Sequence, residues 1–170
     1  MKGIPKMSGA KKISAEELAL LRHTLATVAY RGGKALRGAP DSFANSSSGE
    51  NGRTPAKILA HLGDLYDWAL SIVSGNQVWK DSHPLPWEKE VDRFFASLKK
   101  FDDYLVTGDE MHESAAALFQ GPIADSLTHI GQIAMLRRMA GCSIKGENYH
   151  KAEITAGRLG ADQATPRREF

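Results

Sequence analysis

Hydrophobic residues recur at intervals of three and four along four long segments of the chain, the spacing of amphipathic helices that bury one face. The first segment begins after Ser14, where Glu17 completes a capping box, and ends before Gly38. Its apolar stripe comprises Leu18, Leu21, Leu25, Val28, Ala29, Gly32 and Leu36. Because Gly32 and Gly33 lie inside this pattern, we expect them to permit another helix to pack closely.

The same spacing predicts a second and a third helix. Thr54 is suited to cap the second helix and Pro55 to occupy its first turn, and Gly75 ends it. The third helix extends from Trp87 to Leu105. The predicted buried residues are Ile58, Leu62, Leu65, Ala69 and Ile72 or Val73 in the second helix, and Val91, Phe94, Phe95, Leu98, Phe101 and Leu105 in the third.

The last long helix is predicted to follow Gly121 and Pro122, and a short extra helix in residues 109–119 precedes it. No segment alternates polar and apolar residues strictly, so no strand is predicted. We therefore expect an all-α four-helix bundle with a flexible tail at each end. The predicted boundaries are 1–13 for the N-terminal tail, 14–156 for the bundle and 157–170 for the C-terminal tail.

Composition supports one globular domain and disfavours nucleic acid as a partner. The chain has 170 residues, of which 42% are hydrophobic and 25% charged, enough to bury one substantial core. Lysine and arginine exceed aspartate and glutamate by only two, and several of the lysines lie in the predicted N-terminal tail. A nucleic-acid-binding surface needs clustered basic residues, which the body of the chain lacks.

The number of cysteines and the hydropathy of the chain bear on the cellular compartment in which we expect the protein. Cys142 is the single cysteine, so no intrachain disulfide can form and a cysteine-rich metal site is excluded. No apolar stretch follows the basic first residues, and none elsewhere is long enough to cross a bilayer. We therefore expect a cytoplasmic protein that has no membrane partner.

Polar residues interrupt the apolar faces of two helices. Asp125 and His129 are four residues apart and so share one face of the last helix, which Leu136 continues. His61 lies in the apolar stripe of the second helix. Two imidazoles and a carboxylate can bind a divalent transition metal and leave positions open for chemistry. The alternative is a hydrogen bond between Asp125 and His129 within one helix, with an unrelated core histidine at position 61.

Two stretches resemble the DinB-like (DinB/YfiT) superfamily of four-helix-bundle metalloproteins. They are HLGDLYDW at 61–68 and GPIADSLTHIGQI at 121–133, the latter followed by LRRMAG at 136–141. The resemblance spans roughly residues 14 to 156. It implies an up-down-down-up bundle whose metal is held by one histidine of the second helix and two histidines of the fourth. His61 and His129 match two of these ligands, whereas Asp125 stands where the family usually has the middle histidine.

The resemblance also implies a reaction. It indicates a metal-dependent transferase that uses a low-molecular-weight thiol, or a hydrolase, acting on a small electrophilic substrate, with zinc, nickel, iron or manganese at His61, Asp125 and His129. A possible rival from another class is a non-catalytic helical module, a homodimer in which a structural His/Asp pair fixes helix register.

Five more residues are candidates for the surroundings of the metal. Gln132 is placed to orient a ligand, although such residues often only bond neighbouring helices. Asp64 is an additional ligand or base, or part of a solvated helix face. Trp68 is a pocket wall or core packing. Glu147 and Tyr149 belong to the segment 146–150, which either folds across the mouth of the bundle or forms a plain turn.

Overall fold

A computed structural model of the chain describes residues 13–46, 49–108 and 110–170 and confirms the predicted all-α bundle. Its helices are α1 (Ala15–Leu36), α2 (Pro55–Val73), α3 (Trp87–Thr107), α4 (Ala115–Leu118) and α5 (Ala124–Met139), with short 3₁₀ turns at Asp41–Asn45 and Tyr149–Lys151. The described residues contain no strand, and an isolated β-bridge joins Glu147 to Glu169. The predicted N-terminal tail lies almost entirely outside these residues.

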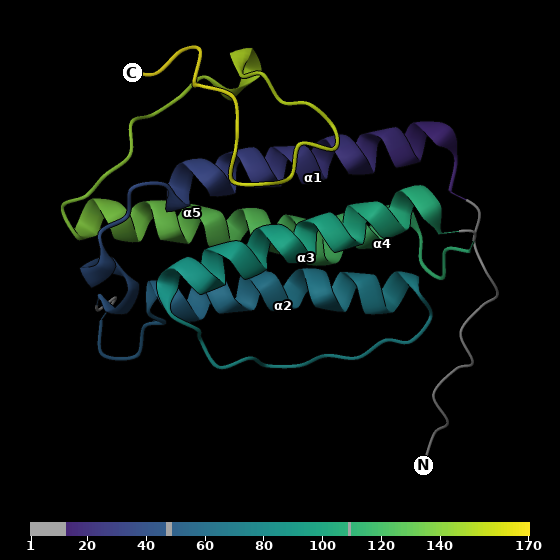
Figure 1. The fold of residues 1–170 in the computed structure, drawn as a ribbon, viewed down its shortest axis with the longest axis horizontal. Helices are drawn as coiled ribbons and strands as arrows, with labels where there is room; N and C mark the ends of the chain where they lie inside the picture. The colour runs from purple at the N-terminus through teal and green to yellow at the C-terminus, as the bar shows by residue number, and fades with distance from the viewer. Residues whose placement is uncertain (1–12, 47–48, 109) are drawn as a thin grey trace.

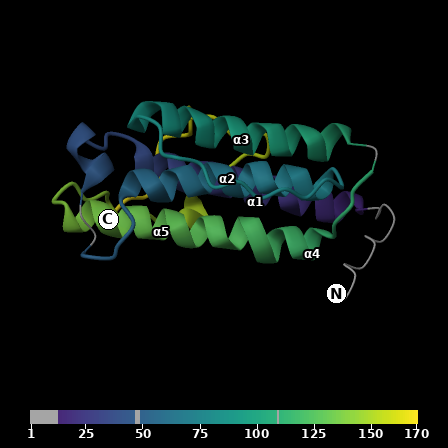
Figure 2. The same cartoon turned by 90° about the horizontal axis from the view of Figure 1, so that it is seen from below.

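The bundle has the up-down-down-up order (Figure 1). Helices α2 and α3 run in the same direction and are joined by a long crossover, residues 74–86, that follows α2 along its outer side (Figures 1 and 2). Helix α5 returns beside α1 and α2. This order places α5 against α2, so that the polar residues predicted on these two helices belong to the same face-to-face contact.

Capping residues fix where the helices begin. Ser14 and Glu17 form the predicted capping box, in which each side chain accepts a hydrogen bond from the other residue's backbone N–H. Thr54 accepts from the Lys57 backbone N–H at the start of α2, with Pro55 in the first turn. Each cap satisfies an amide that the helix itself leaves without a partner, so the starts of α1 and α2 are well determined.

Close helix packing at Gly32 is confirmed. A Cβ atom there would lie 2.9 Å from the ring of Phe94 on α3, closer than real Cβ atoms approach. Phe94 is fully buried, together with Leu25, Leu62, Tyr66 and Ile133 from the other long helices. The missing side chain at Gly32 thus allows a phenylalanine of α3 to fill the centre of the bundle.

The short extra helix before the last helix is confirmed as α4, but Gly121 and Pro122 do not separate the two. Residues Phe119–Ile123 form a π turn that connects α4 to α5 without a break. A π turn widens the helix locally, which accommodates a proline that lacks an amide hydrogen. The turn ends at Ile123, two residues before Asp125, the first polar residue of the candidate site.

The chain after α5 folds back on α1 (Figure 1). Arg137 of α5 donates to the backbone oxygens of Ala35, Arg37 and Gly38, which terminate α1, and to that of Cys142. Leu159 is part of the core, although it lies in the segment predicted as the C-terminal tail. Among the described residues, no helix combines the length and apolar character needed to span a bilayer.

Candidate metal centre

Helices α2 and α5 bring His61, Asp125 and His129 together. One ligand atom from each residue lies within 4.8 Å of the other two. A buried hydrogen bond between Tyr66 and Ser126, 2.6 Å long, ties the same two helices. Ser126 already donates to the Ile123 carbonyl, so its oxygen accepts from Tyr66. Because Ser126 follows Asp125, this bond fixes the register that sets Asp125 opposite His61.

The distances within the cluster suit a metal better than a hydrogen bond. His61 Nε2 lies 3.6 Å from Asp125 Oδ2, and His129 Nε2 lies 3.5 Å from Asp125 Oδ1. N–H···O hydrogen bonds are usually about 2.7–3.2 Å long. Ligand atoms about 2.1 Å from a tetrahedral metal are about 3.4 Å apart. The two distances reach different oxygens of Asp125, and with one ligand atom from each residue the three atoms lie within 4.8 Å, so the cluster can hold a divalent ion.

A hydrogen bond orients His129. Its Nδ1 lies 2.8 Å from Gln132 Oε1, one turn further along α5. Because an amide oxygen only accepts, Nδ1 carries the proton and Nε2 keeps its lone pair directed towards the cluster. Gln132 therefore has the position and the contact that we expected of a residue that orients a ligand.

His61 is held in a different way. Its ring meets the Trp79 ring edge to face, with centroids 5.5 Å apart, and meets His129 similarly at 4.7 Å. Within the part of the chain that the structure describes, no hydrogen bond reaches Nδ1 of His61. Aromatic packing by Trp79 of the crossover thus holds the His61 ring in position, as the hydrogen bond to Gln132 holds the His129 ring.

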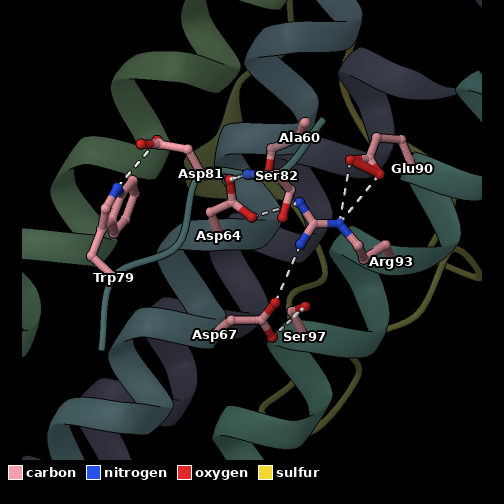
Figure 3. Close-up of polar contacts among 9 residues, drawn as sticks. All are labelled: Ala60, Asp64, Asp67, Trp79, Asp81, Ser82, Glu90, Arg93 and Ser97. Carbon is pink, nitrogen blue, oxygen red and sulfur yellow. Dashed lines mark hydrogen bonds and ion pairs between the residues drawn. The ribbon is translucent and has the colours of Figure 1, made fainter. Parts of the chain in front are cut away.

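The crossover is fixed to α2 on both sides of Trp79. Val78 and Ser71 exchange hydrogen bonds, since the Val78 N–H donates to the Ser71 hydroxyl and the hydroxyl contacts the Val78 carbonyl. The Ser82 N–H donates to Asp64 Oδ2 at 3.0 Å, and Trp79 Nε1 donates to Asp81 (Figure 3). These contacts determine where the indole lies relative to His61.

His61 is suited to bind a metal as a neutral imidazole. Burial lowers the pKa of His61 below its ordinary value of 6.5, and charge repulsion from His129, when that ring is protonated, and from Arg53 lowers it further. The carboxylate of Asp125 acts in the opposite direction, but the net shift is downward. A lowered pKa means that protons compete less with a metal for the nitrogen near neutral pH.

Asp64 is directed away from the metal cluster, to the interface of α2 with α3. It is 5% exposed and accepts from Arg93, which also binds Asp67 and Glu90 (Figure 3). A Cβ atom at Gly63 would lie 2.6 Å from the guanidinium carbon, so the glycine lets the guanidinium lie against α2. We call Arg93, Asp64, Asp67 and Glu90 the Arg93 cluster.

The other candidates divide between the site and the far side of α1. Trp68 packs edge to face on Trp79 and lines a smaller hollow that reaches Asp125. Glu147 is buried against α1, where Tyr30 and Lys34 donate to it at 2.6 and 2.7 Å. Tyr149 packs on Tyr30, and Arg31 lies over its ring. The segment 146–150 therefore covers α1 and supplies no lining residue to the pocket at the cluster.

An open pocket of about 820 Å³ lies beside the cluster. The lining residues are Arg53, Ile58, His61, Asp125, Thr128, His129, Gly131, Gln132, Met135 and Leu136. Ligand sites of small molecules usually measure about 300–1,000 Å³, so the pocket is large enough for a substrate. The arrangement combines three ligand atoms with room for a further molecule.

Sequence reasoning missed Trp79 and Arg53. Both lie outside the amphipathic helices, in the crossover and directly before α2, where helical spacing carries no information. The one available signal for Trp79 was a large aromatic residue in an otherwise polar connection, NQVWKDSH at 76–83. No family model matches the chain, and no curated protein or solved structure matches it significantly.

Proposed function

We propose that the protein is a DinB-like metal-dependent enzyme in which His61, Asp125 and His129 hold one divalent transition metal. The observation that carries the proposal is the meeting of these three residues from two helices, at ligand-to-ligand distances of 3.5 and 3.6 Å, beside a pocket of about 820 Å³. Three protein ligands leave coordination positions for other molecules, as catalytic metal sites do.

The set of two nitrogens and one carboxylate suits zinc, nickel, iron or manganese. Asp125 differs in kind from the middle histidine of the usual family pattern, because a carboxylate is a harder ligand and carries a charge. Asp125 offers each oxygen to a different histidine, and its side chain is 46% exposed. Its negative charge lowers the net charge of the site by one unit compared with three imidazoles.

A metal held by His61, Asp125 and His129 would lower the pKa of a coordinated thiol or water and so would supply a nucleophile near neutral pH. The preferred reaction is transfer involving a low-molecular-weight thiol, and hydrolysis is the alternative. In the transfer, the thiol releases its proton to solvent, sulfur bonds to an electrophilic carbon, and the leaving group departs with its bonding electrons. Gln132 and Trp79 hold the two imidazoles, while the pocket walls restrict the substrate to the space beside Asp125.

Elemental analysis of untagged protein by plasma mass spectrometry is the first test. We expect near-stoichiometric zinc, nickel, iron or manganese in the wild type, and its loss in His129→Ala. His23→Ala is the matched control, because His23 is an exposed histidine of α1 outside the cluster. Thiol-transfer screens follow with the loaded protein.

Failure of the wild type to retain or take up any divalent metal would refute the enzyme proposal. The rival reading would then apply, in which the inward polar residues serve a non-catalytic, homodimeric helical module. Metal that persists in His129→Ala at the wild-type level would show that binding occurs elsewhere on the chain.

A further inference from the structure

The pocket beside the cluster is elongated along α5. Its α5 lining extends from Asp125 to Leu136, which are eleven positions apart and so about 16 Å apart along the helix. Ile58 and His61 of α2 line the opposite side, and Arg53 lies where the chain enters α2. The metal cluster thus occupies one part of a longer pocket, and the rest of the pocket needs its own explanation.

Gly131 lines that pocket and is exposed. It lies inside α5, where glycine costs about 1 kcal/mol relative to alanine. A Cβ atom at Gly131 would meet no atom of the described chain within 4 Å. This differs from Gly32 and Gly63, where Phe94 and Arg93 occupy the space that a Cβ would need. Packing against the protein therefore does not require a glycine at this position, and the space beside it is open to a ligand.

The pocket wall beyond the metal ligands is largely apolar. Ile58 and Leu136 are buried at its base, and Met135 is 53% exposed at its edge. An exposed methionine is flexible and polarisable, and adapts to apolar ligands of different shapes. This wall favours a ligand with a hydrocarbon portion, because burying such a portion removes apolar surface from water on both sides.

The charges around the pocket favour an anion. Arg53 lines it and lies near enough to His61 to lower the pKa of that imidazole by its charge. A divalent metal at the cluster would add two positive charges against the single negative charge of Asp125. Among the pocket's lining residues, Asp125 is the one acidic side chain. A ligand carrying negative charge would therefore be attracted to the pocket and held near Arg53.

We propose that the pocket takes an elongated small molecule with a metal-binding group at one end, a short hydrocarbon portion, and an anionic group at the other end. The metal-binding group lies at His61, Asp125 and His129. The hydrocarbon portion packs beside Gly131 on Ile58, Met135 and Leu136. The anionic group pairs with Arg53. This assignment rests on the proposed metal site and names the class of ligand that the site accepts.

Four thiols test the class on cobalt-loaded protein, where binding of a thiol produces a thiolate-to-cobalt absorption band. Mercaptohexanoate has both the hydrocarbon chain and the anion, mercaptohexanol lacks the anion, mercaptopropionate lacks most of the chain, and mercaptoethanol lacks both. We expect mercaptohexanoate to bind about tenfold more tightly than mercaptopropionate. We expect it to bind about fivefold more tightly than mercaptohexanol.

Two variants assign these preferences to residues. Arg53→Gln should remove the preference for mercaptohexanoate over mercaptohexanol, whereas the control Arg138→Gln, at an exposed arginine of α5 outside the pocket, should keep it. Gly131→Leu should weaken both six-carbon thiols about tenfold and leave mercaptoethanol unchanged. Gly131→Ala, which adds a single methyl group, should fold at least as well as the wild type and bind nearly as tightly.

The outcomes separate this inference from the proposed function. Equal affinities for all four thiols on cobalt-loaded wild type, or preferences unchanged in Arg53→Gln and Gly131→Leu, would overturn the ligand class while leaving the metal site in place. Absence of any cobalt spectrum at stoichiometric metal would overturn the metal site and this inference together.

Discussion

His61 and Asp64 lie three residues apart on α2 and belong to two different groups of charged and polar residues. The groups differ in whether other side chains of the protein supply a hydrogen-bond or ion-pair partner for each member. His61 belongs to the metal cluster, and Asp64 to the Arg93 cluster. In the Arg93 cluster, one guanidinium contacts three carboxylates and the Ala60 carbonyl, so each buried charge has a partner (Figure 3). In the metal cluster, the three residues stand too far apart for hydrogen bonds and face an open pocket.

This difference distinguishes a group that the fold itself satisfies from a group that could hold a metal ion. Both groups contain carboxylates on inward or half-buried helix positions, and sequence spacing alone treats Asp64 and Asp125 alike. A group whose charges are neutralised by the fold stabilises the fold. A group whose polar atoms lack such partners within the protein can bind a ligand instead. For this reason the proposed function rests on the cluster of His61, Asp125 and His129.

Removal of Arg93 should produce the largest effect on stability. Arg93→Met leaves Asp64 and Glu90, which are 5% and 1% exposed, without their counter-ion. We expect the free energy of unfolding of the metal-free protein to fall by about 3 kcal/mol, measured by chemical denaturation. Lys99→Met is the control, because its ion pair with Asp103 is exposed and should contribute little. Equal stability of both variants would contradict the structural role of the Arg93 cluster.

Substitution of Gln132 should weaken the metal cluster without changing the fold. Gln132→Leu removes the acceptor that holds His129 with Nε2 towards the metal. We expect metal affinity to fall by about tenfold to a hundredfold, measured by competition with a chromophoric chelator. The unfolding free energy of the metal-free protein should stay unchanged, since Gln132 is exposed. Gln120→Leu, at another exposed glutamine of the same helical run, should leave metal affinity intact.

Trp79 should have a smaller effect of the same kind. Trp79→Ala removes the edge-to-face contact that holds the His61 ring, and an aromatic contact of this kind is worth about 0.5–1.5 kcal/mol. We expect metal affinity to fall about fivefold and Trp79→Phe to restore most of it. Leu85→Ala tests another exposed apolar residue of the crossover and should have no effect. An unchanged affinity in Trp79→Ala would show that the His61 ring is fixed by other contacts.

The sequence was sufficient to predict the fold and to single out three polar residues that meet between two helices, because both depend on helical spacing. His61, Asp125 and His129 interrupt apolar stripes, and the caps at Ser14 and Thr54 mark where helices begin. Spacing along one helix does not say which partner a polar residue meets on another helix.

The assignments that spacing could not decide are those of Asp64 and Glu147. Asp64 is paired with Arg93, which is 29 positions away, and Glu147 with Lys34, which is 113 positions away. Trp79 and Arg53 lie in connections whose course depends on the assembled bundle. Periodicity along one helix could not predict these contacts between distant residues. They decide which polar groups find a partner within the protein and which are left to bind a ligand.

A second group of charged residues that pair with one another lies on the far side of α1. Substitution in this group should have the smallest effect of those considered. Lys34 donates to Glu147 and Glu169 and so fastens the C-terminal segment to α1. The hydrogen bond from Lys34 lowers the pKa of Glu169 below its ordinary value of 4.5. Because the Glu169 side chain is 33% exposed, solvent screens the interaction and its effect on stability should be small.

The sign of the pH dependence follows from the direction of that shift. In the unfolded chain Glu169 takes up its proton near pH 4.5, whereas the folded protein resists protonation until a lower pH. The stabilisation is therefore fully present above pH 4.5 and is lost as the pH falls through the lowered pKa. We expect the unfolding free energy of the wild type to exceed that of Glu169→Gln at pH 7 and the difference to shrink below pH 4.5. A difference that persists unchanged to pH 3 would mean that Glu169 contributes through packing and not through its charge.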